Sequence, residues 1–237
     1  MSTKTLPIAT LVFCGWFSGC HRATPPPSPV TAVQTPLPVP AVVEPTFEVE
    51  TGFRLIPFTE MNVFPADSTT ANSWRAEGEE FLSTGKPKCY LHTTQSTGNG
   101  IWRYDFRFEP DPALTDPLKL NSQNTGVLFF IQEPHAIWPA SIEVQGRHSE
   151  MGQLRPNGGT AAVEFQDLSA VRETARHPVG EWNSVEVVIV DGALTVTLNG
   201  HVIAIGQPGP LQQGLVGLQA EGHRIRYRRL RYASSTK

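Results

Sequence analysis

The sequence contains little cysteine, and most of it lies near the start of the chain. Of its three cysteines, Cys14 and Cys20 fall in the N-terminal segment, so Cys89 is the single cysteine of the remainder. A disulfide within the folded part is therefore excluded, as is a zinc site built from cysteines. Because Cys89 follows a Lys-Pro-Lys segment typical of a turn entering a strand, we expect a structural thiol there and not a nucleophile.

The sequence also lacks a large excess of charge of either sign. Its formal net charge is −3, which provides none of the basic surface that nucleic-acid binding requires, so we expect no nucleic-acid partner. Five arginines do gather between His223 and Tyr232, where they alternate with apolar residues until the phase shifts at Arg228-Arg229. This pattern is typical of a half-buried strand with a β-bulge and a solvated face.

Long apolar runs are absent too. Residues 6–17 are the clearest such run, and they are too short for a permanent membrane-spanning helix. With Lys4 before them and small residues after them, they are typical of a signal peptide. The following Phe-Ser-Gly-Cys20 resembles the lipobox of bacterial lipoproteins, in which the cysteine is acylated and becomes the first residue of the mature protein.

We therefore predict a lipoprotein signal peptide over residues 1–19, lipidation of Cys20 and a lipid anchor to the cell envelope. His21, where some lipoproteins carry Asp, favours the outer membrane, with the protein facing the periplasm or the cell surface. An ordinary secretory signal cleaved near Cys20 or Ala23 is the alternative. Residues 24–46 contain eight prolines, so we interpret residues 20–46 as an extended, semi-rigid linker before a folded domain over residues 47–235.

The remainder of the chain shows the two-residue periodicity of β-strands and almost no helical pattern. Residues 126–132 are predicted to form a buried strand, and residues 161–165 a second strand. Asp191-Gly192 and Asn199-Gly200 are predicted to form hairpin turns between β-rich runs. Trp182 we expect in the core. Many short antiparallel strands over this length require two packed sheets, which predicts an all-β sandwich or jelly roll.

The most informative stretch is residues 138–146, Trp-Pro-Ala-Ser-Ile-Glu-Val-Gln-Gly. Alternation along a strand places Glu143 and Gln145 on one face and Ile142 and Val144 on the other. The stretch resembles the 3-keto-disaccharide hydrolase domain family, whose other motifs follow in order over residues 51–232. They are Gly52-Phe53 with Leu55, Trp74 with Gly78, Tyr104-Asp105-Phe106, Asn124-Thr125-Gly126, Trp182-Asn183, Asn199-Gly200 and Gly217-Leu218-Gln219-Ala220-Glu221-Gly222.

This resemblance implies a concanavalin A-like jelly-roll sandwich of two antiparallel sheets. It also implies a hydrolase or lyase that cleaves the glycosidic bonds of 3-keto-glycosides or 3-keto-disaccharides, after an upstream sugar oxidoreductase has oxidised carbon 3. A non-catalytic carbohydrate-binding module is the alternative, because the same fold serves both functions. Two departures from the family are Arg229, where Asn is usual, and Phe130-Ile131, where many members carry an Arg.

For the site we expect Glu143 to act as general base or principal sugar ligand, with Glu221 and His223 as an acid/base pair. The candidate substrate-binding residues are Asn124, Trp138, Gln145, His148 and Gln219.

Structural alternatives remain for several of them. Glu143 could pair with Arg147 or with an arginine of the C-terminal strand, Asn124 could serve only a turn, and Ala220 with Gly222 could mark a bend. Glu133, His135, Glu143 and His148 fit no metal signature, so we predict neither metal nor cofactor.

Overall fold

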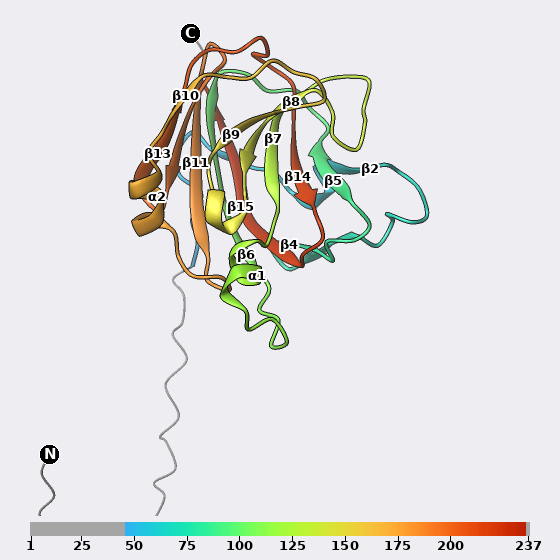
Figure 1. Cartoon of the computed structure of the whole chain (residues 1–237). Helices are drawn as coiled ribbons and strands as arrows, with labels where there is room; N and C mark the ends of the chain where they lie inside the picture. Colours follow the sequence, from blue (N-terminus) through green and yellow to red (C-terminus); the bar gives the residue numbers. More distant parts are fainter. Residues whose placement is uncertain (1–45, 236–237) are drawn as a thin grey trace, which may run out of the picture. The chain divides into compact units, whose positions relative to one another are not determined.

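Two antiparallel sheets pack face to face in this protein (Figure 1). The structure is a computed structural model that describes residues 46–235. The predicted signal peptide, the predicted lipidation at Cys20 and nearly all of the predicted linker lie outside the described residues. The two sheets confirm the predicted all-β sandwich.

The larger sheet has nine strands, with β1 pairing to one side of β15 and the others in the order β10-β13-β12-β11-β6-β15-β4-β3. Their bounds are β1 Arg54–Leu55, β3 Trp74–Glu77, β4 Glu80–Ser83, β6 Gly100–Phe108, β10 Phe165–Asp167, β11 Asn183–Val190, β12 Ala193–Leu198, β13 His201–Gly206 and β15 Ile225–Ser234.

The smaller sheet has six strands in the order β2-β5-β14-β7-β8-β9. Their bounds are β2 Met61–Phe64, β5 Cys89–Thr93, β7 Gly126–Ile131, β8 Ser141–Gln145, β9 Leu154–Asn157 and β14 Leu215–Ala220. Short helical segments connect the strands: α1 Pro117–Asn121, α2 Ser169–Ala175, and the 3-10 turns η1 Phe58–Glu60 and η2 His148–Glu150. None of the helices within residues 46–235 has the length and apolar character needed to span a bilayer.

The core between the sheets follows from alternation along each strand. In β11, Val185, Val187 and Ile189 are buried and their neighbours are not, so one face of the strand supplies the core. The Asp191-Gly192 turn between β11 and β12 has positive φ at both residues, 49° and 82°, which such a tight hairpin requires and which confirms the predicted turn.

Three inner strands of the six-stranded sheet are buried on both faces. Every residue of β5, β7 and β8 is buried, whereas β11 alternates between buried and partly exposed positions. The outward-facing residues Tyr90, Leu128 and Ile131 form a second apolar cluster. The outer face of this sheet is therefore largely shielded from water, including the polar side chains that it carries.

The structure differs from the sequence predictions at residues 161–164 and at Trp182. Residues 161–164 are not in a strand; β10 begins at Phe165 and pairs along only three residues of β13. Trp182 lies outside the core because its indole stacks under the guanidinium groups of Arg107 and Arg228, at 4.8 and 4.1 Å from the ring centroid. Cys89, by contrast, is a buried free thiol at the start of β5, as expected.

The arginine-rich strand β15 has the predicted bulge. Its pairing with β6 shifts register between Arg228 and Arg231, and Arg229 adopts a left-handed φ of 55°. On the solvent side of β15, Arg231 donates two hydrogen bonds to Glu50, at 2.6 and 2.7 Å, and Phe47 stacks on Arg229 and Arg231. The start of the domain is therefore fastened to the outer face of the nine-stranded sheet.

We predict that Glu50 makes this attachment sensitive to acid. Hydrogen bonds from Arg231 lower the pKa of Glu50 from 4.5 to about 2. A carboxyl with a lowered pKa stabilises the fold above its ordinary pKa, and that stability is lost as the pH falls from about 4.5 toward about 2. Glu50→Gln should therefore lower the melting temperature near neutral pH and have much less effect near pH 2, as measured by thermal unfolding.

The exposed Glu48 offers a matched control in the same segment. Glu48→Gln should leave the melting temperature nearly unchanged at both values of pH. A loss of stability in Glu50→Gln that was equal at neutral and acidic pH would contradict the role of the Glu50 charge.

Candidate carbohydrate site on the six-stranded sheet

Most of the predicted site residues meet on the outer face of the six-stranded sheet. Strand register brings them together, because Gln145 lies opposite Gly126, and Glu143 opposite Leu128 on β7 and Arg155 on β9. Gln219 lies on the other neighbour of β7, strand β14. Residues that are distant in sequence thus become neighbours on adjacent strands, about 5 Å apart.

Glu143 is buried, with 6% of its surface exposed. Its Oε2 accepts a hydrogen bond from Asn157 Nδ2 at 3.0 Å, while Oε1 has no hydrogen-bond partner among the described residues. The alternative pairings fail: Arg147 is engaged with Glu150, and the arginines of β15 lie on the other sheet. One oxygen of a buried carboxyl is thus left for a ligand or a proton.

Gln219 lies beside this free oxygen. It is 2% exposed, and its Oε1 also has no partner among the described residues. A Cβ added at Gly126 would lie 2.3 Å from Gln219 Oε1 and 2.4 Å from Glu143 Oε1, so both oxygens rest against this glycine. Two buried acceptors side by side need a donor between them, which a ligand hydroxyl or a proton on Glu143 would supply.

Glu221 follows the end of β14 and forms the second carboxyl of the site. Its Oε2 accepts from Asn124 Nδ2 at 2.6 Å, and its Oε1 lies 3.8 Å from Lys88 Nζ. Asn124 therefore orients the Glu221 carboxyl in addition to lying just before β7. Lys88 Nζ also lies 5.7 Å from the ring centroid of Trp138, which brings that indole to the same edge.

Burial raises the pKa of both carboxyls. For Glu143 the charge of Glu221 raises it further, while Asn157, Arg155 and Arg147 act in the opposite direction. For Glu221 the opposing charges are Lys88, Arg147 and Arg155. The arrangement is thus two poorly solvated carboxyls surrounded by cations, and such groups accept and release protons closer to neutral pH than ordinary carboxyls do.

The remaining predicted residues are used differently. The strand ends at Ala220 and Gly222 has a φ of 97°, so the chain bends at the place where Ala220 and Gly222 allowed a bend. His223 Nδ1 accepts from the backbone N–H of Asn124 at 3.1 Å, and burial lowers the pKa of His223. His223 therefore supports Asn124, while the Glu221 carboxyl accepts its hydrogen bond from the Asn124 side chain.

The side chains of Gln145 and His148 form hydrogen bonds with other groups of the protein. Gln145 Oε1 accepts from the Arg147 N–H at 2.7 Å. The ring nitrogens of His148 lie 2.9 Å from Asn121 Oδ1 and 3.1 Å from the His177 carbonyl, so the structure does not bring His148 into the cluster. Residues 46–235 contain no group of three or more His, Cys, Asp or Glu side chains arranged to hold a metal ion.

Comparison with known protein families identifies the domain. The model of the 3-keto-alpha-glucoside-1,2-lyase-like domain matches residues 62–232, which span every strand from the second residue of β2 into β15. The chain belongs to this family. Membership confirms the resemblance seen in the sequence and relates the chain to hydrolases and lyases of glycosides. No curated protein matches the chain.

Solved structures support the fold of this lyase-like domain. Two proposed glycosyl hydrolases from Parabacteroides distasonis align with TM-scores of 0.55 and 0.54, at 16% and 17% identity, over 77% and 78% of this chain and 99% and 95% of theirs. A Bacillus subtilis protein of unknown function with a galectin-like fold aligns with a TM-score of 0.51 at 10% identity, over 78% of this chain and 99% of its own. At such identities the likeness shows the fold alone.

The departure from the family at Arg229 has a local explanation. Asn tolerates the left-handed conformation better than most residues, and Arg229 adopts this conformation at the bulge of β15. Its guanidinium lies 3.3 Å from Asp105 Oδ2 and stacks on Phe47. These contacts of Arg229 lie on the nine-stranded sheet, so Arg229 does not belong to the cluster around Glu143.

Sequence reasoning missed Lys88, Arg155 and Asn157 in this lyase-like domain. Asn157 could have been found only from the register of β8 with β9, where Ser141 lies opposite it, because the two strands have no hairpin signature between them. Lys88 was assigned to a turn, and nothing in the sequence indicates that the turn lies next to Glu221.

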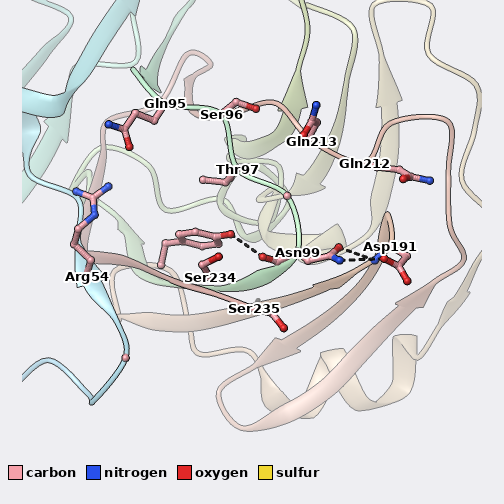
Figure 2. Close-up of a pocket in the computed structure, with 13 residues that line it drawn as sticks. Arg54, Gln95, Ser96, Thr97, Asn99, Asp191, Gln212, Gln213, Ser234 and Ser235 are labelled. Carbon is pink, nitrogen blue, oxygen red and sulfur yellow. Dashed lines mark hydrogen bonds between the residues drawn. The ribbon is translucent and has the colours of Figure 1, made fainter. Parts of the chain in front are cut away.

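A polar cavity of about 890 Å³ lies away from the carboxyls of Glu143 and Glu221 (Figure 2). Its lining includes Gln95, Gln212 and Gln213, and it is framed by the reciprocal hydrogen bonds between Asn99 and Asp191, at 3.0 and 2.7 Å. Gln213 precedes β14, whereas Glu221 follows it, so the cavity and the carboxyls are at opposite ends of that strand. The carboxyl pair, with its unpaired acceptors, is the stronger candidate for chemistry.

We predict that Glu143→Gln stabilises the fold near neutral pH. A carboxyl whose pKa is raised on folding destabilises the native state as the pH rises above the ordinary pKa, because the charged form is poorly solvated. Glutamine removes that charge, retains an acceptor for Asn157 and adds a donor toward Gln219. Thermal unfolding should show a higher melting temperature than wild type near pH 8 and a smaller difference near pH 4. A variant less stable than wild type at both would contradict the buried, unpaired state of Glu143.

Proposed function

We propose that this chain cleaves the glycosidic bond of sugars that carry a ketone at carbon 3. The single observation that carries the proposal is the unpaired Oε1 of buried Glu143 beside the second carboxyl, Glu221, on a sheet face that excludes water. Family membership supports 3-keto-glycosides as the proposed substrate class.

The chemistry is an elimination. A ketone at carbon 3 acidifies the hydrogen on carbon 2, and Glu143 removes that hydrogen as a proton. The electron pair of the C2–H bond then forms an enolate, which expels the oxygen on carbon 1 and leaves a double bond between carbons 1 and 2. Glu221 donates a proton to the departing oxygen. Addition of water across the double bond completes hydrolysis.

The surroundings of the two carboxyls suit these steps. The raised pKa of Glu143 makes it a stronger base than an ordinary carboxylate, and the raised pKa of Glu221 keeps a proton available for the leaving group. Arg147 and Arg155 lie close enough to lower both pKa values, so the same cations can stabilise the negative charge of an enolate. Trp138, beside Lys88, offers a flat surface for the sugar ring.

The test is turnover of a 3-keto-disaccharide by purified wild type and Glu143→Gln. We expect release of the second sugar by wild type and a loss of kcat of about 100- to 10,000-fold in the variant, the range for removal of a general base. Calorimetric binding of the substrate by the variant checks that the site is intact.

Glu48→Gln is the control, because Glu48 is exposed and belongs to the N-terminal segment that lies on the nine-stranded sheet. It should retain most of the turnover. Binding of the 3-keto-disaccharide by wild type without release of sugar would refute the enzymatic proposal and establish a carbohydrate-binding module.

We also propose that the domain acts at the cell envelope, held by a lipid on Cys20 through the proline-rich linker. Bacteria that express the full chain and grow with an alkyne-labelled fatty acid should yield a labelled protein in the membrane fraction. Cys20→Ala should abolish the label, while the cysteine of the folded domain serves as control in Cys89→Ala. Labelling that persists in Cys20→Ala would refute the anchor.

A further inference from the structure

The loop of residues 132–140, between β7 and β8, takes a long path across the outer face of the six-stranded sheet. β7 and β8 are adjacent antiparallel strands, which a short turn can join. The loop instead reaches Tyr90 on β5, and β14 lies between β5 and β7. Near its start, Gln132 Nε2 donates to the Gln213 carbonyl at 2.7 Å. The loop thus crosses β14, the strand that carries Gln219.

A chain of hydrogen bonds fastens this loop at His135. The hydroxyl of Tyr90 lies 2.5 Å from His135 Nδ1, and His135 Nε2 lies 2.9 Å from Glu133 Oε1. The other carboxylate oxygen of Glu133 accepts from the His135 N–H at 2.9 Å. Burial raises the pKa of Tyr90, so its phenol keeps its proton and donates to Nδ1, while Nε2 donates to Glu133.

Ring contacts support the same attachment. The His135 ring centroid lies 4.8 Å from that of His92 and 5.1 Å from that of Phe64, on strands β5 and β2. Tyr90 is fully buried beneath it. His135 therefore joins the loop to the two strands of the sheet that are farthest from β8.

The position of His135 has a consequence at the carboxyl site. Trp138 follows it by three residues in the same loop and lies against Lys88, whose Nζ is 3.8 Å from Glu221 Oε1. A loop released at His135 would hold Trp138 at this edge only through Pro139-Ala140, whose carbonyls accept hydrogen bonds just before β8.

We propose that His135 is a positioning residue, which together with Tyr90 holds the 132–140 loop across the sheet so that Trp138 contacts the sugar bound at Glu143 and Glu221. The role in sugar binding rests on the proposed function. The attachment of the loop does not, and it is tested without substrate.

The first experiment measures hydrogen exchange of the 132–140 amides by mass spectrometry in the full chain. Tyr90→Phe removes one hydroxyl and keeps the ring, and His135→Ala removes the whole attachment. We expect exchange in this loop to accelerate about three- to tenfold in Tyr90→Phe, the worth of one hydrogen bond, and more in His135→Ala. Unchanged exchange in both variants would overturn the proposal.

Tyr232→Phe is the matched control, because the Tyr232 hydroxyl donates a single hydrogen bond, to the Asn99 carbonyl at 2.7 Å, and Tyr232 lies on β15 of the nine-stranded sheet. It should leave exchange of residues 132–140 unchanged. His135→Asn keeps an acceptor near the place of Nδ1 and should restore part of the protection. Equal acceleration by His135→Asn and His135→Ala would show that ring packing, and not the bond to Tyr90, holds the loop.

The second experiment compares KM and kcat for the 3-keto-disaccharide. Tyr90→Phe and His135→Ala should raise KM about three- to tenfold with kcat nearly unchanged, which is the signature of lost binding. Trp138→Ala should raise KM similarly, and combining it with His135→Ala should add little. Faster exchange with an unchanged KM would overturn the positioning role. A wild type without turnover would instead refute the proposed function and leave the exchange result standing.

Discussion

Exclusion of water from both faces of the six-stranded sheet is the constraint on which the site depends. One face of β7 and β8 packs in the core, and the residues on the other face are buried as well. A carboxyl placed on such a face loses hydration, which is why the pKa of Glu143 and Glu221 is raised. The same strands thus supply part of the core and bury the site, which raises the pKa of its carboxyls.

The outer faces of the two sheets carry different features. Arginines on the outer face of the nine-stranded sheet bind the start of the domain through Glu50 and Phe47. The carboxyl pair lies on the outer face of the other sheet, so the chain enters the domain on the side away from the site.

Much of the fold could be predicted from the sequence, because hairpin turns such as Asp191-Gly192 and two-residue periodicity are local signals. Glu143, Gln219 and Asn124 could be singled out because they occur in family motifs. The roles of Asn157 and Lys88 could not be predicted, since they depend on strand register and on where a turn lies in space. The short helices α1 and α2 are too brief to produce a periodic pattern, whereas the bend at Gly222 is one of the alternatives that the sequence offers.

The claim that the outer face of the six-stranded sheet binds the sugar is tested most directly by a crystal structure of Glu143→Gln soaked with a 3-keto-disaccharide. We expect the sugar over Gly126, with one hydroxyl between Gln219 and residue 143 and its ring against Trp138. Sugar found instead in the polar cavity near Asn99 and Asp191, with the sheet face empty, would contradict it.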